Sequence, residues 1–153
     1  MANTFKVITF AAEPASAGTA YTMYTVAGST TTVVLGLILT NIHTSAITVE
    51  VELVSDTGSR GGANNVDNTT SFLAKDVSIP AGSSLELLSG GKVVLETTDE
   101  IKIDCSVADK VSGILSIMEI TYDGLYWTRT LRSIYFIRYG DVYYVVYYLI
   151  YSC

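Results

Sequence analysis

The chain has 153 residues, enough for one domain with a sizeable core. Its formal net charge of −6 argues against a nucleic-acid partner, because binding to phosphates requires clustered Lys and Arg side chains. Only 16% of the residues are charged and the mean hydropathy is +0.39, which predicts that other subunits cover part of the surface.

The first half of the chain contains four predicted strands. Residues 4–10, 19–26 and 47–53 have the composition or alternation of half-buried strands, and residues 47–53 place an acidic face in water. Residues 31–40 are apolar almost throughout, which predicts a central strand buried on both faces. Gly36 inside this run predicts a bulge or a close backbone approach.

A polar segment, residues 55–71, follows the fourth strand and is expected to form a long surface loop. Its oxygen-bearing side chains could in principle bind calcium, but their spacing does not match a calcium-binding loop. We therefore expect an ordinary polar loop and no metal site. The residues weighed for that site are Asp56, Asn64, Asn65, Asp67 and Asn68.

Residues 72–103 consist of short alternating runs separated by Gly, Pro and polar turns. Four strands are expected, at residues 77–79, 85–87, 93–95 and 101–103, arranged as a meander, and residues 114–120 form the last strand of the body. Strands at this spacing predict an all-β protein, an antiparallel β-sandwich of about seven to nine strands with a jelly-roll or immunoglobulin-like topology.

The search for chemistry gives little. His43 is the only histidine and lies in a predicted turn, without a nucleophile-elbow pattern around Thr44 or Ser45. Asp99 and Glu100 are adjacent, but neighbours in an alternating strand point to opposite faces, so they form no acid–base pair. Cys105 and Cys153 lack metal-ligand spacing. We expect no enzyme activity and no cofactor.

Residues 122–153 differ from the body, residues 1–121, and are treated as a C-terminal extension. The extension holds nine of the eleven tyrosines, with three Arg against two Asp, whereas the body has six Lys or Arg against thirteen Asp or Glu. Its apolar run, residues 142–151, is shorter than the roughly 20 residues that span a bilayer, so no membrane partner is expected.

Gly140 and Asp141 are a two-residue hairpin signal. The Tyr-rich extension is therefore expected to form a hairpin or, as the alternative, an extended tail. An apolar, aromatic strand pair needs a protein partner to cover it. The candidate interaction residues are Ile134, Tyr135, Phe136, Tyr143, Tyr144, Tyr147 and Tyr148.

The body resembles a small virion structural protein of tailed phages that infect aquatic cyanobacteria. The resemblance runs through residues 30–37, 47–53, 79–85, 95–99 and 117–120 together with Asn41. It covers roughly residues 1–121 and implies a non-enzymatic particle component located in the virion. The extension departs from that pattern, since the resemblance implies a chain that ends near Thr121.

Three functions follow from these observations. The first is an accessory capsid decoration or knob-like virion protein, assembled with other virion proteins and with copies of itself. A tail- or fibre-associated virion protein is a variant of the first. The second is a carbohydrate- or receptor-binding β-sandwich, and the third, a hydrolase using His43, has the least support.

Overall fold

The computed structural model of the chain describes residues 2–55, 69–121, 134–139 and 142–147. The chain divides into two compact units, Met1–Asp123 and Gly124–Cys153. Among its described residues the first unit contains nine strands and no helix. The strands are β1 (Ala2–Glu13), β2 (Tyr21–Thr25), β3 (Thr30–Asn41), β4 (Ile47–Ser55), β5 (Thr69–Ile79), β6 (Ser84–Leu87), β7 (Val93–Leu95), β8 (Glu100–Cys105) and β9 (Val111–Thr121).

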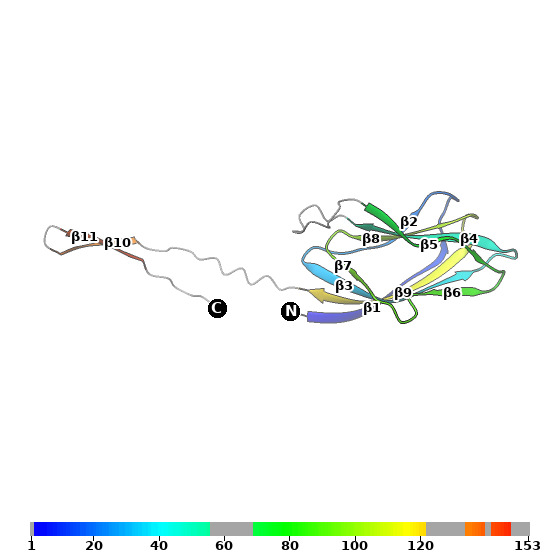
Figure 1. The fold of residues 1–153 in the computed structure, drawn as a ribbon, viewed down its shortest axis with the longest axis horizontal. Helices are drawn as coiled ribbons and strands as arrows, with labels where there is room; N and C mark the ends of the chain where they lie inside the picture. Colours follow the sequence, from blue (N-terminus) through cyan, green and yellow to red (C-terminus); the bar gives the residue numbers. More distant parts are fainter. Residues whose placement is uncertain (1, 56–68, 122–133, 140–141, 148–153) are drawn as a thin grey trace. The chain divides into compact units, whose positions relative to one another are not determined.

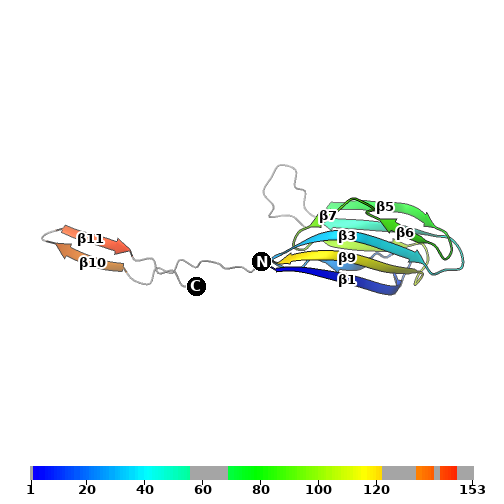
Figure 2. The ribbon, with the colours of Figure 1, turned by 90° about the horizontal axis from the view of Figure 1, so that it is seen from below.

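These strands form two antiparallel sheets packed face to face, as Figures 1 and 2 show. Sheet A has the order β1-β9-β3-β6, with β7 also paired to β3, and sheet B has the order β2-β8-β4-β5. The pairs are nested along the chain: β1 with β9, β2 with β8, β3 with β6 and β7, and β4 with β5. This is a long hairpin rolled into a sandwich, the jelly-roll topology. The predicted all-β sandwich is confirmed.

The expected meander is wrong in its pairing, although its four strands exist. β6 and β7 both pair with β3, and β8 lies between β2 and β4. Turn residues mark where a strand ends, but they do not fix which strand becomes its neighbour in a rolled hairpin. The polar segment also ends earlier than expected, because β5 begins at Thr69.

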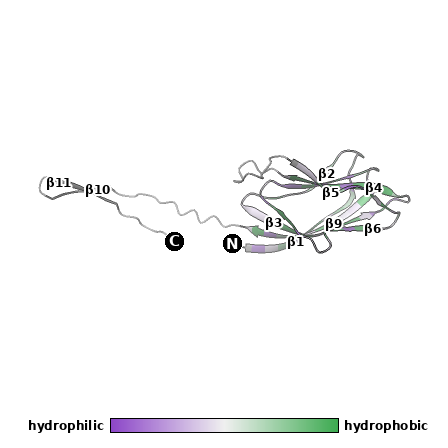
Figure 3. Cartoon of the chain, viewed as in Figure 1, coloured by the Kyte–Doolittle hydropathy of each residue, from purple (hydrophilic) through white to green (hydrophobic). Residues whose placement is uncertain are grey.

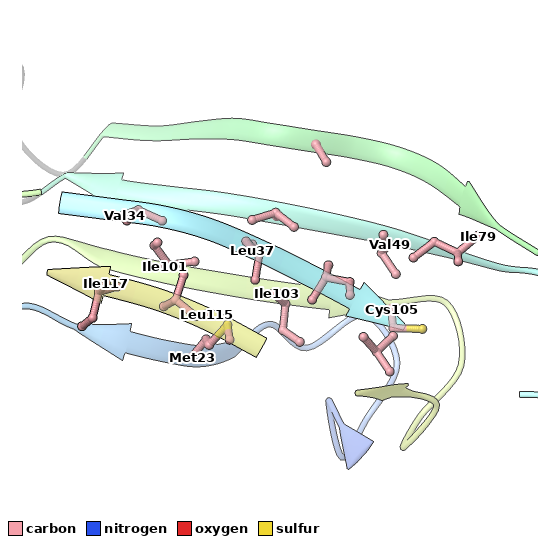
Figure 4. Close-up of a cluster of buried hydrophobic side chains, with 14 of the residues drawn as sticks. Met23, Val34, Leu37, Val49, Ile79, Ile101, Ile103, Cys105, Leu115 and Ile117 are labelled. Atoms are coloured by element: carbon pink, nitrogen blue, oxygen red, sulfur yellow. The ribbon is translucent and has the colours of Figure 1, made fainter. Parts of the chain in front are cut away.

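The core lies between the two sheets (Figure 4). Alternate residues of β3, β9, β4 and β8 point into it, which is the consequence of period-two side-chain direction in strands. The largest fully buried side chains are Leu37, Leu39, Ile47, Ile79, Leu95, Ile101, Ile103, Leu115, Ile117, Val34, Val49 and Val51.

The prediction that residues 31–40 are buried on both faces is wrong. β3 is central in sheet A, but its burial alternates, with Leu37 and Leu39 buried and Ile38 exposed. The run is continuously apolar because the outward side of this sheet is itself apolar. The bulge predicted at Gly36 is confirmed, since the pairing of β3 with β9 shifts between Val34 and Gly36.

Asn41 fixes the corner between β3 and β4. Its buried side-chain amide donates to the carbonyl oxygens of Ser45 and Ile79, both at 2.9 Å. Its side-chain oxygen accepts the backbone N–H of His43 at 2.7 Å. One side chain therefore satisfies three backbone groups where the chain crosses from sheet A to sheet B.

The second unit contains the antiparallel pair β10 (Ile134–Tyr139) and β11 (Val142–Tyr147). Ile134 pairs with Tyr147 and Tyr139 with Val142. The expected hairpin strands are therefore present, and the predicted turn at Gly140 and Asp141 lies outside the described residues.

Candidate interaction surface

The side of sheet A that faces away from the core is built mainly from apolar and uncharged residues. The register places Phe5 of β1 beside Met118 of β9, Met118 beside Val33 of β3, and Val33 beside Val94 of β7. These four side chains form an apolar row across four strands, on positions that alternate with core residues. We call this side the outer face of sheet A.

A second row runs parallel to the first. Thr9 pairs with Ile114, Ile114 with Ile38, and Ile38 with Glu86 of β6. Glu86 stands at the sheet edge, and none of the outward residues of β1, β9, β3 and β7 among the described residues is charged. With normal strand spacings, each row extends about 14 Å across the sheet, and the two rows lie about 13 Å apart along the strands.

Several of these side chains are open to solvent. The exposed fraction is 71% for Phe5, 65% for Val7 and 59% for Val94. Ile114 and Ile38 are also exposed. Contiguous exposed apolar side chains are typical of protein–protein contact surfaces, whereas single ones are ordinary.

The outward side of sheet B has the opposite character. It carries charged side chains on β4, β5 and β8, and these form local ion pairs between Lys75 and Glu50 and between Lys102 and Glu100. Colouring by hydropathy in Figure 3 shows both polar and apolar residues along the strands. The charges are concentrated on one side of the sandwich, so the two outward sides suit water and a protein partner respectively.

A polar cluster at one edge ties β1 and β9 of sheet A to β2 of sheet B. The Tyr24 hydroxyl donates to Glu119 Oε1 at 3.0 Å and shares a 2.8 Å hydrogen bond with Thr32. Lys6 Nζ lies 2.5 Å from Glu119 Oε2. Every charged or polar end in the cluster has a partner inside the same chain.

Protonation in this cluster follows from its surroundings. Burial raises the pKa of Tyr24 to about 12, and the neighbouring Glu119 also raises it. The hydrogen bond from Lys6 lowers the pKa of the Glu119 carboxyl. Tyr24 is therefore protonated and Glu119 ionised near neutral pH, an arrangement that connects strands and leaves neither group poised for proton transfer.

In the structure the catalytic candidates His43, Asp99 and Glu100 each bond to neighbouring groups of the fold. His43 lies in the bend after β3, and its Nδ1 accepts the backbone N–H of Ser45 at 3.2 Å. Asp99 is buried and accepts the backbone N–H of Glu96 at 2.9 Å, while Glu100 bonds Thr25 and Lys102 on the outward side. The prediction that Asp99 and Glu100 point to opposite faces is confirmed.

The remaining predicted site residues divide between described and undescribed parts of the chain. The five calcium candidates all lie outside the described residues, and the described part holds no cluster of three metal-ligating side chains. Cys105 is buried, and burial raises the pKa of its thiol. No helix in the described part is long and apolar enough to cross a membrane.

The candidate interaction residues of the extension fall on β10 and β11, with the exception of Tyr148, which lies outside the described residues. The ladder pairs Ile134 with Tyr147 and Tyr135 with Val146. Their role in contacts with a partner stays a prediction.

Residues of the outer face were not identified from the sequence. The signal that could have found them is apolar character on both alternating sets of positions in three strands: β1, β3 and β9. Phe5 and Val7 belong to one set of β1, and Ile8 and Phe10 to the other. That these strands are neighbours in one sheet could not be read from the pattern.

Comparison with known proteins gives distant structural similarity. No protein-family model matches the chain, and no curated protein matches it. A chain of the structure of infectious bursal disease virus Gx strain matches with a TM-score of 0.47 and 16% identity, over 82% of this chain and 33% of the viral chain. The present chain thus spans about a third of that protein.

A Bacillus endospore appendage, from a family of disulfide-linked pili, matches with a TM-score of 0.39 and 18% identity. That match covers 78% of this chain and 87% of the other. Both scores are below 0.5, so neither match identifies a family or a function.

Proposed function

We propose that the protein is a non-enzymatic virion structural protein, an accessory capsid decoration or knob-like component that assembles through protein–protein contacts. The observation that carries the proposal is the solvent-exposed outer face of sheet A, which is uncharged across the described parts of β1, β9, β3 and β7, with Phe5 and Val7 its most exposed apolar residues. A surface of this kind is expected on a subunit that is covered in its assembled state.

The fold by itself supports more than one function. Jelly rolls serve as viral capsid domains and as lectin domains, and function depends on the surfaces they carry. The resemblance of residues 1–121 to a small phage virion protein favours the particle. The concentration of charge on the outward side of sheet B is also consistent with a subunit that has one side in water and the other against a protein.

The non-enzymatic part of the proposal rests on how the polar groups are used. The cluster of Tyr24, Glu119, Lys6 and Thr32 joins strands of two sheets. His43 accepts a backbone N–H in its own turn. These groups hold the chain in place, and each has a structural partner that a catalytic role would have to break.

The extension is proposed as a second contact element. β10 and β11 are rich in Tyr, Val and Ile and contain the candidate residues Ile134, Tyr135 and Tyr144. Arg138 is the one charged residue in these two strands. We expect the extension to pack against another copy or another particle protein. Truncation after Thr121 should keep the body folded by circular dichroism and reduce light scattering. Unfolding of the truncated chain would show that the extension is part of the body.

The experiment that tests the function is quantitative mass spectrometry of this chain in purified phage particles. A decoration protein should be present in hundreds of copies per particle, whereas six, twelve or a small multiple would place it in the tail. Absence from the particles would refute the proposal. Binding of the purified chain to a glycan array, retained after truncation at Thr121, would favour the carbohydrate-binding alternative.

A further inference from the structure

The edges of the two sheets differ in how they are protected from other strands. Sheet B ends in β2, which has five residues and a register shift between Thr22 and Tyr24, and in β5, whose pairing with β4 shifts twice. The other edge of sheet A is made of β6 and β7, with four and three residues. Short and irregular edges of this kind resist pairing with a second chain.

β1 is the exception among the described edges. It has twelve residues, and its register with β9 is unbroken over the nine positions from Ala2 to Phe10. The outermost position of β1 in sheet A can be followed in Figure 2. A long regular edge leaves a row of unpaired backbone N–H and C=O groups, which is a template for another strand.

The side chains of β1 also lack the cover that a finished edge would have. Residues 3–7 are exposed without interruption, although every second one faces the other sheet. Among them, Phe5 and Val7 are the most exposed large apolar side chains described. A strand laid against β1 would cover both of them from the side.

We propose that β1 pairs antiparallel with β1 of a second copy around a two-fold axis, joining the two A sheets into one continuous sheet. This inference rests on the proposed function, because it names the partner and the surface of the assembly. Pairing centred near Phe5 or Val7 engages seven positions of the regular stretch, residues 2–8 or 4–10. It would form about seven backbone hydrogen bonds, within the range of about ten, give or take five, found in a standard protein interface.

Electrostatics permits a second copy at this edge despite the net charge of −6. Lys6 is the only charged residue between positions 2 and 10, and it is paired with Glu119 of its own chain. The approaching strand therefore covers the Lys6 ammonium group, whose charge Glu119 already neutralises. A register with Lys6 opposite Lys6 is disfavoured by like charge, so the two-fold axis passes near Phe5 or near Val7.

The test measures amide hydrogen exchange along β1 in the full-length protein at rising concentration. In the pair, the β1 amides that do not face β9 should exchange at least about tenfold more slowly than in the dilute monomer. Val7→Lys, a change at a solvent-exposed position that leaves the body folded, should abolish this protection. The matched control is Val94→Lys, which adds the same charge to the outer face on β7 and should leave the protection intact.

Disulfide trapping provides the second measurement, in a Cys153→Ser background where the remaining Cys105 is buried. Phe5→Cys or Val7→Cys should form covalent dimers under mild oxidation, and Val94→Cys should form them much more slowly. Phe5→Lys serves as a second disrupting variant if Val7→Lys loses its circular dichroism signal.

Three results would overturn the pairing. The first is fast exchange of the free β1 amides at every concentration. The second is equal loss of protection in Val7→Lys and Val94→Lys, which would indicate stacked outer faces instead of joined edges. The third is retained protection in both charged β1 variants. In each case the chain could still be counted in purified particles, so failure of the pairing is distinguishable from failure of the proposed function.

Discussion

Replacing Asn41 by Ala tests how the two sheets are joined at the corner between β3 and β4. The side chain is 1% exposed and makes three hydrogen bonds: two from its amide to Ser45 and Ile79, and one accepted from the backbone of His43. Alanine is compatible with the strand conformation but removes all three side-chain hydrogen bonds at once. The change therefore isolates the contribution of a single buried polar side chain.

The cost can be worked out bond by bond. The Ile79 carbonyl is buried, so losing its donor should cost about 1–3 kcal/mol. The groups on Ser45 and His43 lie closer to solvent, where water can replace the bond, and should cost about 0.5–1 kcal/mol each. The total is about 2–5 kcal/mol in the free energy of unfolding, which for a body of this size lowers Tm by about 8–20 °C.

Urea and thermal unfolding followed by circular dichroism measure this loss. Thr40→Ala is the control, because the Thr40 hydroxyl bonds Ser84 at an exposed site and its loss should change stability by less than about 1 kcal/mol. Asn41→Asp should be more destabilising at neutral pH, since the carboxylate faces two carbonyl oxygens.

The pH dependence of Asn41→Asp follows from its unfavourable surroundings. They raise the pKa of the new carboxyl above its unfolded value of about 3.9. The variant should therefore recover part of its stability as pH falls and lose it as pH rises through the folded pKa. A loss below about 1 kcal/mol for Asn41→Ala would refute this account of the corner.

Three further predictions follow from other parts of the sandwich. Val51→Asp buries an unpaired charge and should lower the free energy of unfolding by more than about 4 kcal/mol in denaturant unfolding. Glu50→Gln, on the outward side, should leave Tm nearly unchanged. Equal effects of the two variants would contradict the register of β4. A Cβ on Gly113 would lie 2.2 Å from the Phe10 ring, so Gly113→Ala should cost about 1–3 kcal/mol and be less than additive with Phe10→Leu in a double-mutant cycle. Because the pKa of Tyr24 is raised to about 12, the contribution of Tyr24 to stability should be constant below its unfolded pKa of about 10 and fall as pH rises to about 12, and Tyr24→Phe should remove that part of the slope in pH-dependent unfolding.

Several features of the fold followed from local patterns alone. Alternation in residues 47–53 correctly placed Val49 and Val51 inside and Glu50 outside, because side chains on a strand alternate between faces. Gly36 correctly marked a bulge, since glycine in a strand commonly signals irregular pairing. The turns at Gly82 and Gly90 separated strands that do exist, and both glycines have positive φ.

The sequence by itself determined where the strands run and which side of most strands is buried, because those properties depend on neighbours within a few residues. Only the tertiary structure decided which strands meet, since the nested pairing joins segments as far apart as β1 and β9. That pairing brings Phe5, Met118 and Val33 into one row and turns three separately apolar strands into one uncharged face. Among the described strands it also leaves β1 at an edge of sheet A. No residue of β1 encodes that position, because an edge is defined by which strands lie beside it.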